Sequence, residues 1–216
     1  MSASAERLGP FLLRQEAGCF PLGRDSLLLG EFATVRRGWR VCDLGCGSGV
    51  LSLLLLARES TLSLTAVDLS PAAADLCRRN FAENGLEAPV LTGDLTDPAL
   101  LPAGSFDLVI SNPPYFAAGS GGNGGEARME GTCTLESLCA AAARLVKNGG
   151  RFALVHRPER LAELLEALRC RGLEPKRLRL CHHSPAAPPF AALVEAVRQG
   201  RPGLEILPPF LDRPDP

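Results

Sequence analysis

Two clusters of residues in this sequence have the types and spacing needed to bind a ligand and act on it. The first is the glycine-rich segment 43–49, Asp-Leu-Gly-Cys-Gly-Ser-Gly, which follows a β-rich run and precedes a leucine-rich helical run. Glycines let a ligand approach the backbone closely, and the N-terminus of the following helix favours polar or anionic groups. The GxGxG spacing differs from the GxGxxG of nicotinamide-binding folds. We therefore expect a cofactor other than a nicotinamide dinucleotide at this turn.

Three carboxylates, Asp43, Asp68 and Asp94, fall close to the carboxyl ends of successive expected strands. Asp68 stands where a ribose diol needs a carboxylate to accept its two hydroxyl protons, and Asp94 could meet an adenine amine. Each residue also has a structural interpretation. Asp43 and Asp68 could cap strand ends, and Asp94 lies in the run 92–97, which is typical of an ordinary turn. Their combination at the spacing of βαβ units favours cofactor binding.

The second cluster is Asn-Pro-Pro-Tyr at 112–115, directly after an expected strand. Open α/β sheets place their sites at the carboxyl ends of strands. Pro113 and Pro114 remove two N–H donors, so the peptide carbonyls around them remain as acceptors, and Asn112 adds an amide oxygen. Such acceptors can hold both hydrogens of a planar NH2 group, direct its lone pair toward a methyl donor and accept the developing positive charge. Tyr115 offers a flat face for a planar substrate. The alternative is a turn that ends a strand.

The elements that must position these clusters alternate between strand and helix, which is typical of a mainly parallel α/β sheet. Strands are expected at 40–44, 65–69, 90–92, 107–111, 151–156, 177–181 and 193–197, and helices at 26–33, 50–58, 135–146 and 158–169. A further helix has clear boundaries: Ser70 is its N-cap, Pro71 its first residue, and Asn84 with Gly85 its end. The glycine-rich segment 116–131 is expected to be a mobile loop beside the site, with a solvated linker as the alternative.

Length and composition indicate one globular domain with a substantial core, because the chain has 216 residues, of which 46% are hydrophobic and 22% charged. The net charge of -1 excludes a nucleic-acid binder held by bulk positive charge, so any such contact must be a local patch. Only Lys147 and Lys176 are lysines among the 23 basic residues, so 21 are arginines. Arginine suits bidentate phosphate contacts, although a GC-rich genome explains the same bias.

The eight cysteines include no CxxC pair and lie mostly in apolar runs, so reduced core thiols are expected rather than disulfides. This pattern indicates a cytoplasmic protein. The N-terminal residues show neither a signal peptide nor a membrane anchor. His156, His182 and His183 lack zinc-type spacing with cysteine or carboxylate, so no metal is expected, and His156 is interpreted as a structural residue at a strand end.

Asp43–Gly49, Asp68 and Asn112–Tyr115 together resemble the class I S-adenosylmethionine-dependent methyltransferases that modify exocyclic amino or amide nitrogens. More specifically, the segments 20–30, 127–136, 155–160 and 173–176 resemble the bacterial tRNA(Val) adenine-N(6)-methyltransferase family, and the likeness runs from about residue 20 to residue 209. Arg24 departs from the small hydroxyl residue common in that family.

The resemblance implies a Rossmann-like α/β fold, with a seven-stranded, mostly parallel sheet whose last strand is antiparallel. Residues 1–38 would form an N-terminal extension with a short helix, 39–200 the methyltransferase domain and 201–216 a proline-rich tail. The cofactor would be S-adenosylmethionine, and residues expected to bind it are Asp25, Asp43, Gly45, Cys46, Gly47, Gly49, Asp68, Leu69, Asp94, Leu95 and Asn112. The expected catalytic residues are Asn112, Pro113, Pro114 and Tyr115, and the expected substrate contacts are Tyr115, Phe116 and Arg128.

The function implied is methyl transfer to an exocyclic amine, with adenine N(6) in tRNA as the leading substrate. Arg128, Arg157 and Arg160 are candidates for phosphate contacts, with solvated surface charge as the alternative. A protein glutamine amide of a release factor is the first alternative substrate, but such enzymes typically carry a helical recognition domain where only about forty residues precede Val41. The second alternative is a non-catalytic module that binds the cofactor together with RNA or protein, against which Asn112 and Tyr115 argue.

Overall fold

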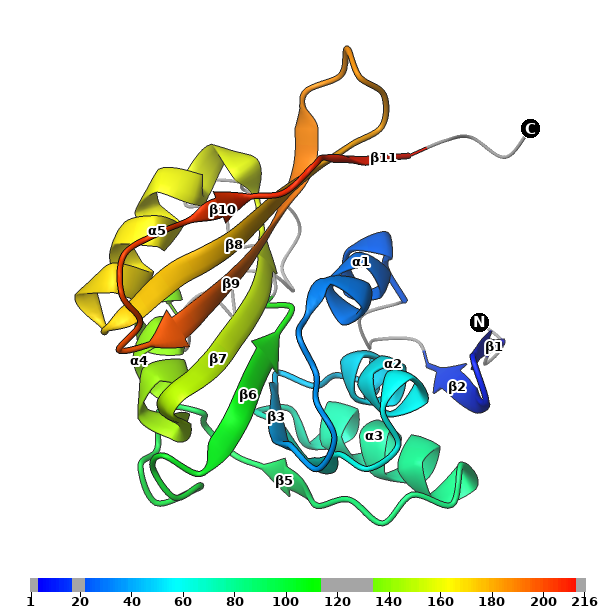
Figure 1. The fold of residues 1–216 in the computed structure, drawn as a ribbon. Coiled ribbons are helices and arrows are strands. Elements are labelled where there is room, and N and C mark those ends of the chain that lie inside the picture. The colour runs from blue at the N-terminus through cyan, green and yellow to red at the C-terminus, as the bar shows by residue number, and fades with distance from the viewer. Residues whose placement is uncertain (1–3, 17–21, 114–133, 213–216) are drawn as a thin grey trace.

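The computed structural model describes residues 4–16, 22–113 and 134–212, and most of their strands belong to one mixed sheet with helices on both faces (Figure 1). The strands of this sheet are β3 (Arg40–Leu44), β4 (Ser63–Asp68), β5 (Val90–Thr92), β6 (Phe106–Ser111), β7 (Val146–His156), β8 (Leu173–His182), β9 (Pro189–Arg198), β10 (Glu205–Ile206) and β11 (Phe210–Leu211). Their order is β10-β8-β9-β7-β6-β3-β4-β5, with β11 also paired to β8.

The seven strands β3 to β9 confirm the expected sheet. Neighbours from β5 through β4, β3 and β6 to β7 are parallel, whereas β9 is antiparallel to both β7 and β8. The short strands β10 and β11 were not predicted. They lie in the expected proline-rich tail and pair in parallel with β8, so this part of the tail belongs to the sheet.

The helices divide between the two faces of the sheet. They are α1 (Arg24–Phe32), α2 (Val50–Arg58), α3 (Pro71–Glu83), α4 (Leu135–Leu145) and α5 (Leu161–Cys170). Buried residues of α1, α2 and α3 form one hydrophobic cluster with one face of the sheet, and those of α4 and α5 form a second cluster on the other face. The predicted helix at 158–169 is divided into a 3-10 turn, η1 (Pro158–Arg160), and α5.

The boundaries of α3 follow the sequence signals. Ser70 Oγ accepts a hydrogen bond from the Ala73 N–H at 3.4 Å, Pro71 is the first helical residue, and Asn84 is the C-cap. Gly85 has a φ of +66°, a conformation that suits glycine after a helix end. This helix therefore begins and ends where its local sequence predicts.

An N-terminal hairpin, β1 (Ser4–Leu8) and β2 (Phe11–Gln15), was not predicted and packs against α3. Two asparagines of α3 hold its main chain. Asn84 Oδ1 accepts from the Leu12 N–H and Asn84 Nδ2 donates to the Leu12 carbonyl, and Asn80 makes the equivalent pair of bonds with Arg14. The two carboxamides thus bind the main-chain N–H and carbonyl groups of β2 that do not pair with β1, as a neighbouring strand would.

The cysteines that the structure describes are reduced thiols. The expected core position is confirmed for Cys42, Cys46, Cys77, Cys139 and Cys181. Cys170 is exposed at the end of α5, which corrects the expectation for that residue, whereas Cys19 and Cys133 lie outside the described residues. None of the described helices is both long and apolar enough to cross a membrane.

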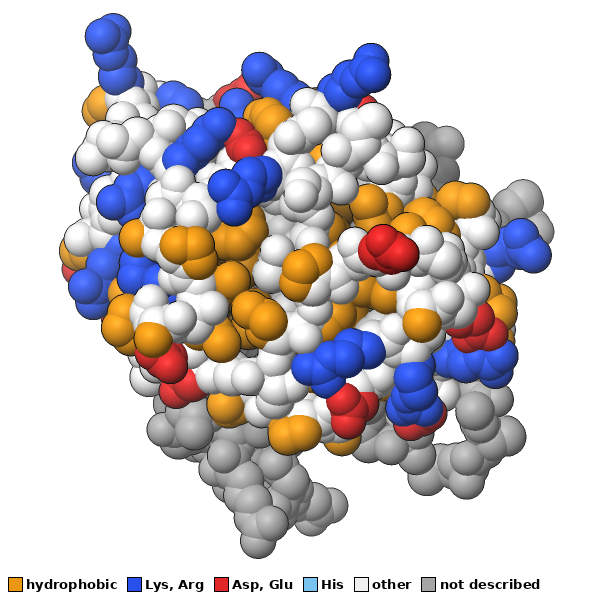
Figure 2. Space-filling view, turned by 90° about the horizontal axis from the view of Figure 1, so that it is seen from below, with side chains coloured by type: hydrophobic (Ala, Val, Ile, Leu, Met, Phe, Trp, Pro, Cys, Tyr) orange, Lys and Arg blue, Asp and Glu red, His pale blue; other side chains and the backbone are white. Residues whose placement is uncertain are grey.

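The edge of the sheet where the parallel strands begin faces the viewer in Figure 2, where hydrophobic side chains form patches among basic and acidic ones. A shallow pocket of about 240 Å³ lies between the start of β4 and the segment before β5, lined mainly by Leu56, Leu62, Leu64, Leu86 and Pro89. The lining holds few groups that could do chemistry. The polar clusters predicted from the sequence lie at the opposite edge.

Candidate active site

The strand register brings three of the predicted polar residues to one face and one edge of the sheet. Asp43 on β3 is aligned with Ala66 on β4 and with Ile110 on β6. Side chains alternate between the faces of a sheet, so Asp68 and Asn112, each two residues further along, lie on that same face. The sheet order reverses between β3 and β6, and α/β folds bind ligands at such a switch point.

Gly45 continues β3 between Asp68 and Asn112, at the same level of the register. Its φ is +73°, which favours glycine, and a Cβ built there would meet no atom within 4 Å. The backbone of the turn is fixed to β4, because the Gly45 and Cys46 N–H groups donate to the Val67 carbonyl at 2.8 and 3.0 Å. The floor between the carboxylate and the carboxamide is therefore rigid and open to a ligand.

The other two glycines of the turn, Gly47 and Gly49, differ in how closely they are packed. Gly47 resembles Gly45, with a φ of +55° and open space around a built Cβ. Gly49 has a φ of +88°, and a Cβ there would lie 2.9 Å from Cys77 Sγ and 3.1 Å from the Phe81 ring. Gly49 therefore allows α3 to pack closely against the turn, while Gly45 and Gly47 leave the backbone of the turn exposed to a ligand.

Asp43 is completely buried beneath the glycine turn. Its Oδ2 accepts hydrogen bonds from Ser52 Oγ at 2.7 Å and from the Ser52 N–H at 3.2 Å, whereas its Oδ1 has no partner among the described residues. Burial raises the pKa of Asp43 to about 7, although the Ser52 hydrogen bonds act in the opposite direction and the neighbouring charge of Asp68 adds to the rise. A buried oxygen without a donor is an acceptor that a ligand or water could satisfy.

Asp68 has a structural task that the sequence did not reveal. Its Oδ2 accepts from the Gly47 N–H at 2.8 Å and its Oδ1 from the Ser70 N–H at 2.9 Å, so the carboxylate joins the glycine turn to the start of α3. Asp68 is 9% exposed. Each oxygen of an ionised carboxylate can accept a second hydrogen bond, so both remain able to accept from a ligand hydroxyl.

Asn112 lies at the end of β6 and is half-buried. Its Nδ2 donates to Ser26 Oγ at 2.9 Å, a contact with the first turn of α1. Pro113 follows it, which removes one donor and restricts Asn112 to extended backbone. Next to it, Ser111 Oγ donates to the Leu44 carbonyl at 2.7 Å and ties the ends of β6 and β3 together.

The remaining predicted cofactor residues surround this centre. Asp94 follows β5 close to Asp68, because the Gly93 N–H donates to the Asp68 carbonyl at 3.0 Å. Asp94 Oδ1 accepts from the Thr96 N–H and hydroxyl at 2.8 and 2.7 Å, which is the turn that the sequence offered as its alternative. Leu69 is 46% exposed beside Asp68, Leu95 packs partly against the core, and Asp25 lies in the first turn of α1.

Other predicted residues lie away from this centre or outside the described part of the chain. His156 is buried at the end of β7, and burial lowers its pKa. Arg160 Nε donates to Glu163 at 2.8 Å, whereas Arg157 is exposed at the start of η1. Residues 114–133 are outside the described residues, and they include the predicted site residues Pro114, Tyr115, Phe116 and Arg128.

Three polar residues of the site were not singled out by the sequence: Ser26, which contacts Asn112, Ser52, which contacts Asp43, and Asn80. Asn80 is fully buried and its Nδ2 donates to the Ser48 carbonyl in the glycine turn at 2.8 Å. Ser52 and Asn80 lie within helices whose apolar patterns dominate the sequence signal. In the described ranges, no group of histidine, cysteine and carboxylate residues could hold a metal ion.

These residues fit a cofactor that carries hydroxyl groups, such as a ribose. The unpartnered Asp43 Oδ1 is a free acceptor, the open turn at Gly45 and Gly47 allows close approach, and Asp68 offers acceptors for hydroxyls. Ser48 Oγ is a second buried oxygen of the turn without a partner in the described structure.

Comparison with known proteins gives a consistent result. A family model described as methyltransferase small domain matches residues 23–168. Two relatives named tRNA1(Val) (adenine(37)-N6)-methyltransferase, from Flavobacteriaceae bacterium (strain 3519-10) and Aeromonas salmonicida (strain A449), are 30% identical over 149 residues and 36% identical over 151 residues. The aligned regions cover 69% and 67% of this chain, but 64% and 63% of those relatives, so less than two thirds of their length is matched.

A solved structure described as a predicted O-methyltransferase from Agrobacterium tumefaciens is also similar. It is 26% identical, has a TM-score of 0.71, and the match covers 87% of this chain and 86% of that chain. The resemblance and the fold expected from the sequence are thereby confirmed.

Proposed function

Because the chain belongs to the methyltransferase small domain family, we propose that it transfers a methyl group from S-adenosylmethionine to an exocyclic amine, with adenine N(6) of a tRNA as the acceptor. The observation that carries the proposal is the arrangement of Asp68 and Asn112 on either side of the open Gly45 floor. One side of this floor has acceptors for ribose hydroxyls, and the other has an acceptor for an amine. A methyl donor bound across Gly45 lies between them.

The cofactor supplies a methyl group already activated by a sulfonium, so the protein needs no covalent intermediate. Asp68 would accept from the ribose hydroxyls, the exposed Leu69 would pack against the adenine ring, and Asp94 and Leu95 would border it. The positive charge of a bound cofactor would favour the ionised form of Asp43, whose pKa burial raises to about 7. The other residues proposed to line the cofactor site are Asp25, Gly45, Cys46, Gly47 and Gly49.

Asn112 holds the acceptor amine. Its Oδ1 and the carbonyls around Pro113 and Pro114 accept the two amine hydrogens, which turns the nitrogen lone pair toward the methyl group. The same oxygens stabilise the positive charge that forms on the nitrogen during transfer. Tyr115 and Phe116 stack on the substrate base, and Arg128 contacts phosphate.

The names of the two relatives support a tRNA adenine as the substrate, and a tRNA substrate implies a cytoplasmic protein. The near-zero net charge requires RNA contact through local patches. Arg157, exposed at the start of η1 after β7, and Arg160, which pairs with Glu163, are the described candidates.

The test is to incubate the purified chain and its Asn112→Ala variant with isotopically labelled cofactor and three acceptors: unmodified tRNA, ribosomal RNA and a release-factor domain. Mass spectrometry of digested nucleosides and peptides then identifies the product. We expect N(6)-methyladenosine in tRNA with the wild-type chain and at least tenfold less with the variant. Methylglutamine in the release factor would replace the RNA substrate by a protein amide, and cofactor binding without any product would favour a binding module.

A further inference from the structure

The candidate catalytic amide is held by a residue 86 positions earlier in the chain. Ser26 is 7% exposed in the first turn of α1, and its Oγ accepts a hydrogen bond from Asn112 Nδ2 at 2.9 Å. This contact joins α1 to the end of β6, where Asn112 lies beside the open backbone at Gly45. The Ser26 hydroxyl is therefore the group of α1 that contacts the Asn112 carboxamide.

The orientation of a carboxamide decides what it can do for an amine. Rotation of the Asn112 side-chain amide by half a turn exchanges its oxygen, which accepts, for its NH2, which donates. Only the oxygen can accept a hydrogen from an amine. In this structure Ser26 Oγ accepts from the Nδ2 end, so Oδ1 is the end of the carboxamide that remains to accept from an amine.

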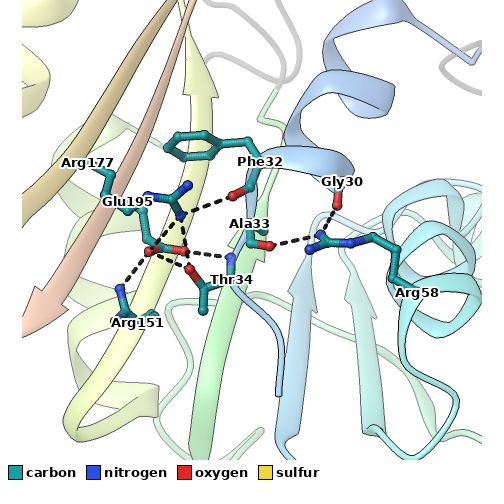
Figure 3. A network of polar contacts seen from close by, with 8 residues as sticks. All are labelled: Gly30, Phe32, Ala33, Thr34, Arg58, Arg151, Arg177 and Glu195. Carbon is teal, nitrogen blue, oxygen red and sulfur yellow. Dashed lines mark hydrogen bonds and ion pairs between the residues drawn. The ribbon is translucent and has the colours of Figure 1, made fainter. Parts of the chain in front are cut away.

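Ser26 can hold Asn112 in place only if α1 is itself fixed relative to the sheet. Contacts at the C-terminal end of α1 fix it. The last turn of the helix leaves carbonyls without helical partners. Arg58 from α2 donates to the carbonyls of Gly30 and Ala33, the latter at 2.8 Å, and Arg177 from β8 donates to the Phe32 carbonyl at 3.2 Å (Figure 3). Guanidinium groups at a helix C-terminus also complement its dipole.

A buried carboxylate completes this anchor. Glu195 on β9 is fully buried and accepts from the Thr34 N–H at 2.8 Å and the Thr34 hydroxyl at 2.9 Å, just after α1 ends. Arg151 and Arg177 neutralise it at 2.6 and 3.3 Å (Figure 3). Three strands and α2 therefore fix the end of α1, so Ser26 at its beginning is held in place relative to the sheet.

We propose that Ser26 is a positioning residue that fixes the Asn112 carboxamide with its oxygen toward the acceptor amine. This role rests on the methyl transfer proposed above. Ser26 acts through Asn112 and does not itself contact the reacting atoms.

The kinetic test compares Ser26→Ala with Ser26→Thr, which keeps the hydroxyl. Loss of one neutral hydrogen bond predicts about a tenfold lower kcat for Ser26→Ala, with unchanged KM and Kd for S-adenosylmethionine, and recovery in Ser26→Thr. In an Asn112→Ala background, Ser26→Ala should cause no further loss, because its effect passes through the missing amide. An equal additional loss in that background would overturn the proposal.

A spectroscopic test does not depend on activity. The side-chain NH2 resonances of Asn112, assigned by their absence from Asn112→Ala, should shift in Ser26→Ala and return in Ser26→Thr. Glu31→Ala, on the exposed face of the same helix, is the matched control and should leave both resonances and kcat unchanged. Unchanged Asn112 resonances in Ser26→Ala would overturn the proposal. An inactive wild-type chain would instead overturn the proposed function, while the resonances would still decide whether Ser26 holds the amide.

Should Ser26→Ala fail to fold, as judged by its thermal midpoint, Ser26→Cys takes its place in both tests. A thiol is a weak acceptor of similar size, so it should reproduce the loss of kcat and the shift of the Asn112 resonances. Wild-type values in this folded variant would contradict the proposal.

Discussion

Asp43 is an ionisable residue in a fully buried position, and replacing it by asparagine should separate the stability of the protein from its affinity for the cofactor. Burial raises the pKa of Asp43 from its ordinary value of 3.8 to about 7. A carboxyl whose folded-state pKa exceeds its unfolded-state value stabilises the folded state only below the unfolded value. Its contribution is lost as the pH rises through the folded pKa. In the cofactor-free protein, Asp43 therefore destabilises the fold increasingly from pH 4 to pH 7.

The size of this effect follows from the two pKa values. One pKa unit corresponds to about 1.4 kcal/mol, so ionised Asp43 costs about 4 kcal/mol of folding free energy above pH 8. Of this, about 2 kcal/mol develops between pH 5 and pH 7. Asparagine can keep the acceptor for Ser52, but its NH2 group points where Asp43 Oδ1 has no partner, at a cost of about 1–3 kcal/mol. The net stabilisation of Asp43→Asn at pH 8 is therefore about 1–3 kcal/mol.

The assay is urea unfolding of both proteins without cofactor at pH 5, 6, 7 and 8, together with calorimetry of S-adenosylmethionine binding. The stability difference should move by about 2 kcal/mol in favour of Asp43→Asn between pH 5 and pH 7, while its cofactor affinity falls at least tenfold. The unpartnered NH2 group of asparagine does not titrate, so its cost is the same at every pH. The change of the stability difference with pH therefore reports the ionisation of Asp43 alone. Stability curves that stay parallel across this range would refute the reasoning.

Asp107 provides the matched control. Partial burial would raise its pKa, but the contact with Lys147 and the hydrogen bond from the Arg40 N–H lower it overall. This carboxylate therefore contributes stability above its unfolded-state pKa of 3.8 and loses it only at more acidic pH. Asp107→Asn should be less stable than the wild type by a constant amount between pH 5 and pH 8.

Three further substitutions test the site. Asn112→Ala should retain cofactor affinity and lose about 100-fold in turnover, measured as initial rates of methyl transfer; a wild-type rate would remove Asn112 from the mechanism. Asp68→Ala should weaken S-adenosylmethionine binding by roughly 1–3 kcal/mol, because the ribose loses an acceptor and Gly47 loses its brace, and calorimetry with equal affinities or tight NAD binding would contradict this. Arg128→Ala should weaken tRNA binding and reduce its log-salt slope by about one, with unchanged cofactor affinity; identical salt dependence would exclude a phosphate contact.

The parts of the fold that the sequence predicted are those whose signals are local. The end of β3 and the turn that follows need glycines at positive φ, and the boundaries of α3 need Ser70, Pro71 and Gly85, all of which act within a few residues. The short strands β10 and β11 offer no comparable signal, because two-residue pairings depend on the neighbouring β8 edge. The hairpin β1–β2 likewise depends on the asparagines of α3.

The site divides in the same way. The approach of Asp43, Asp68 and Asn112 could be predicted, because alternation and parallel order place the ends of neighbouring strands together. The contact between Ser26 and Asn112 could not, because it joins residues 86 positions apart through the placement of α1. The two N–H groups that Asp68 holds were equally hidden, since they depend on the path of the glycine turn.

The anchoring of α1 also has a consequence for the order in which the molecule is assembled. Thr34 meets its Glu195 partner across 161 residues of chain, and the Phe32 carbonyl meets Arg177 across 145. During synthesis, α1 emerges long before these partners exist, whereas the glycine turn and its helices need only nearby sequence. A nascent or truncated chain that ends before β8 would therefore have the glycine turn but would lack the Arg177 and Glu195 contacts, so only Arg58 would bind the last carbonyls of α1. The anchor of α1, and with it the proposed positioning of Asn112 by Ser26, is then complete only when the last strands join the sheet.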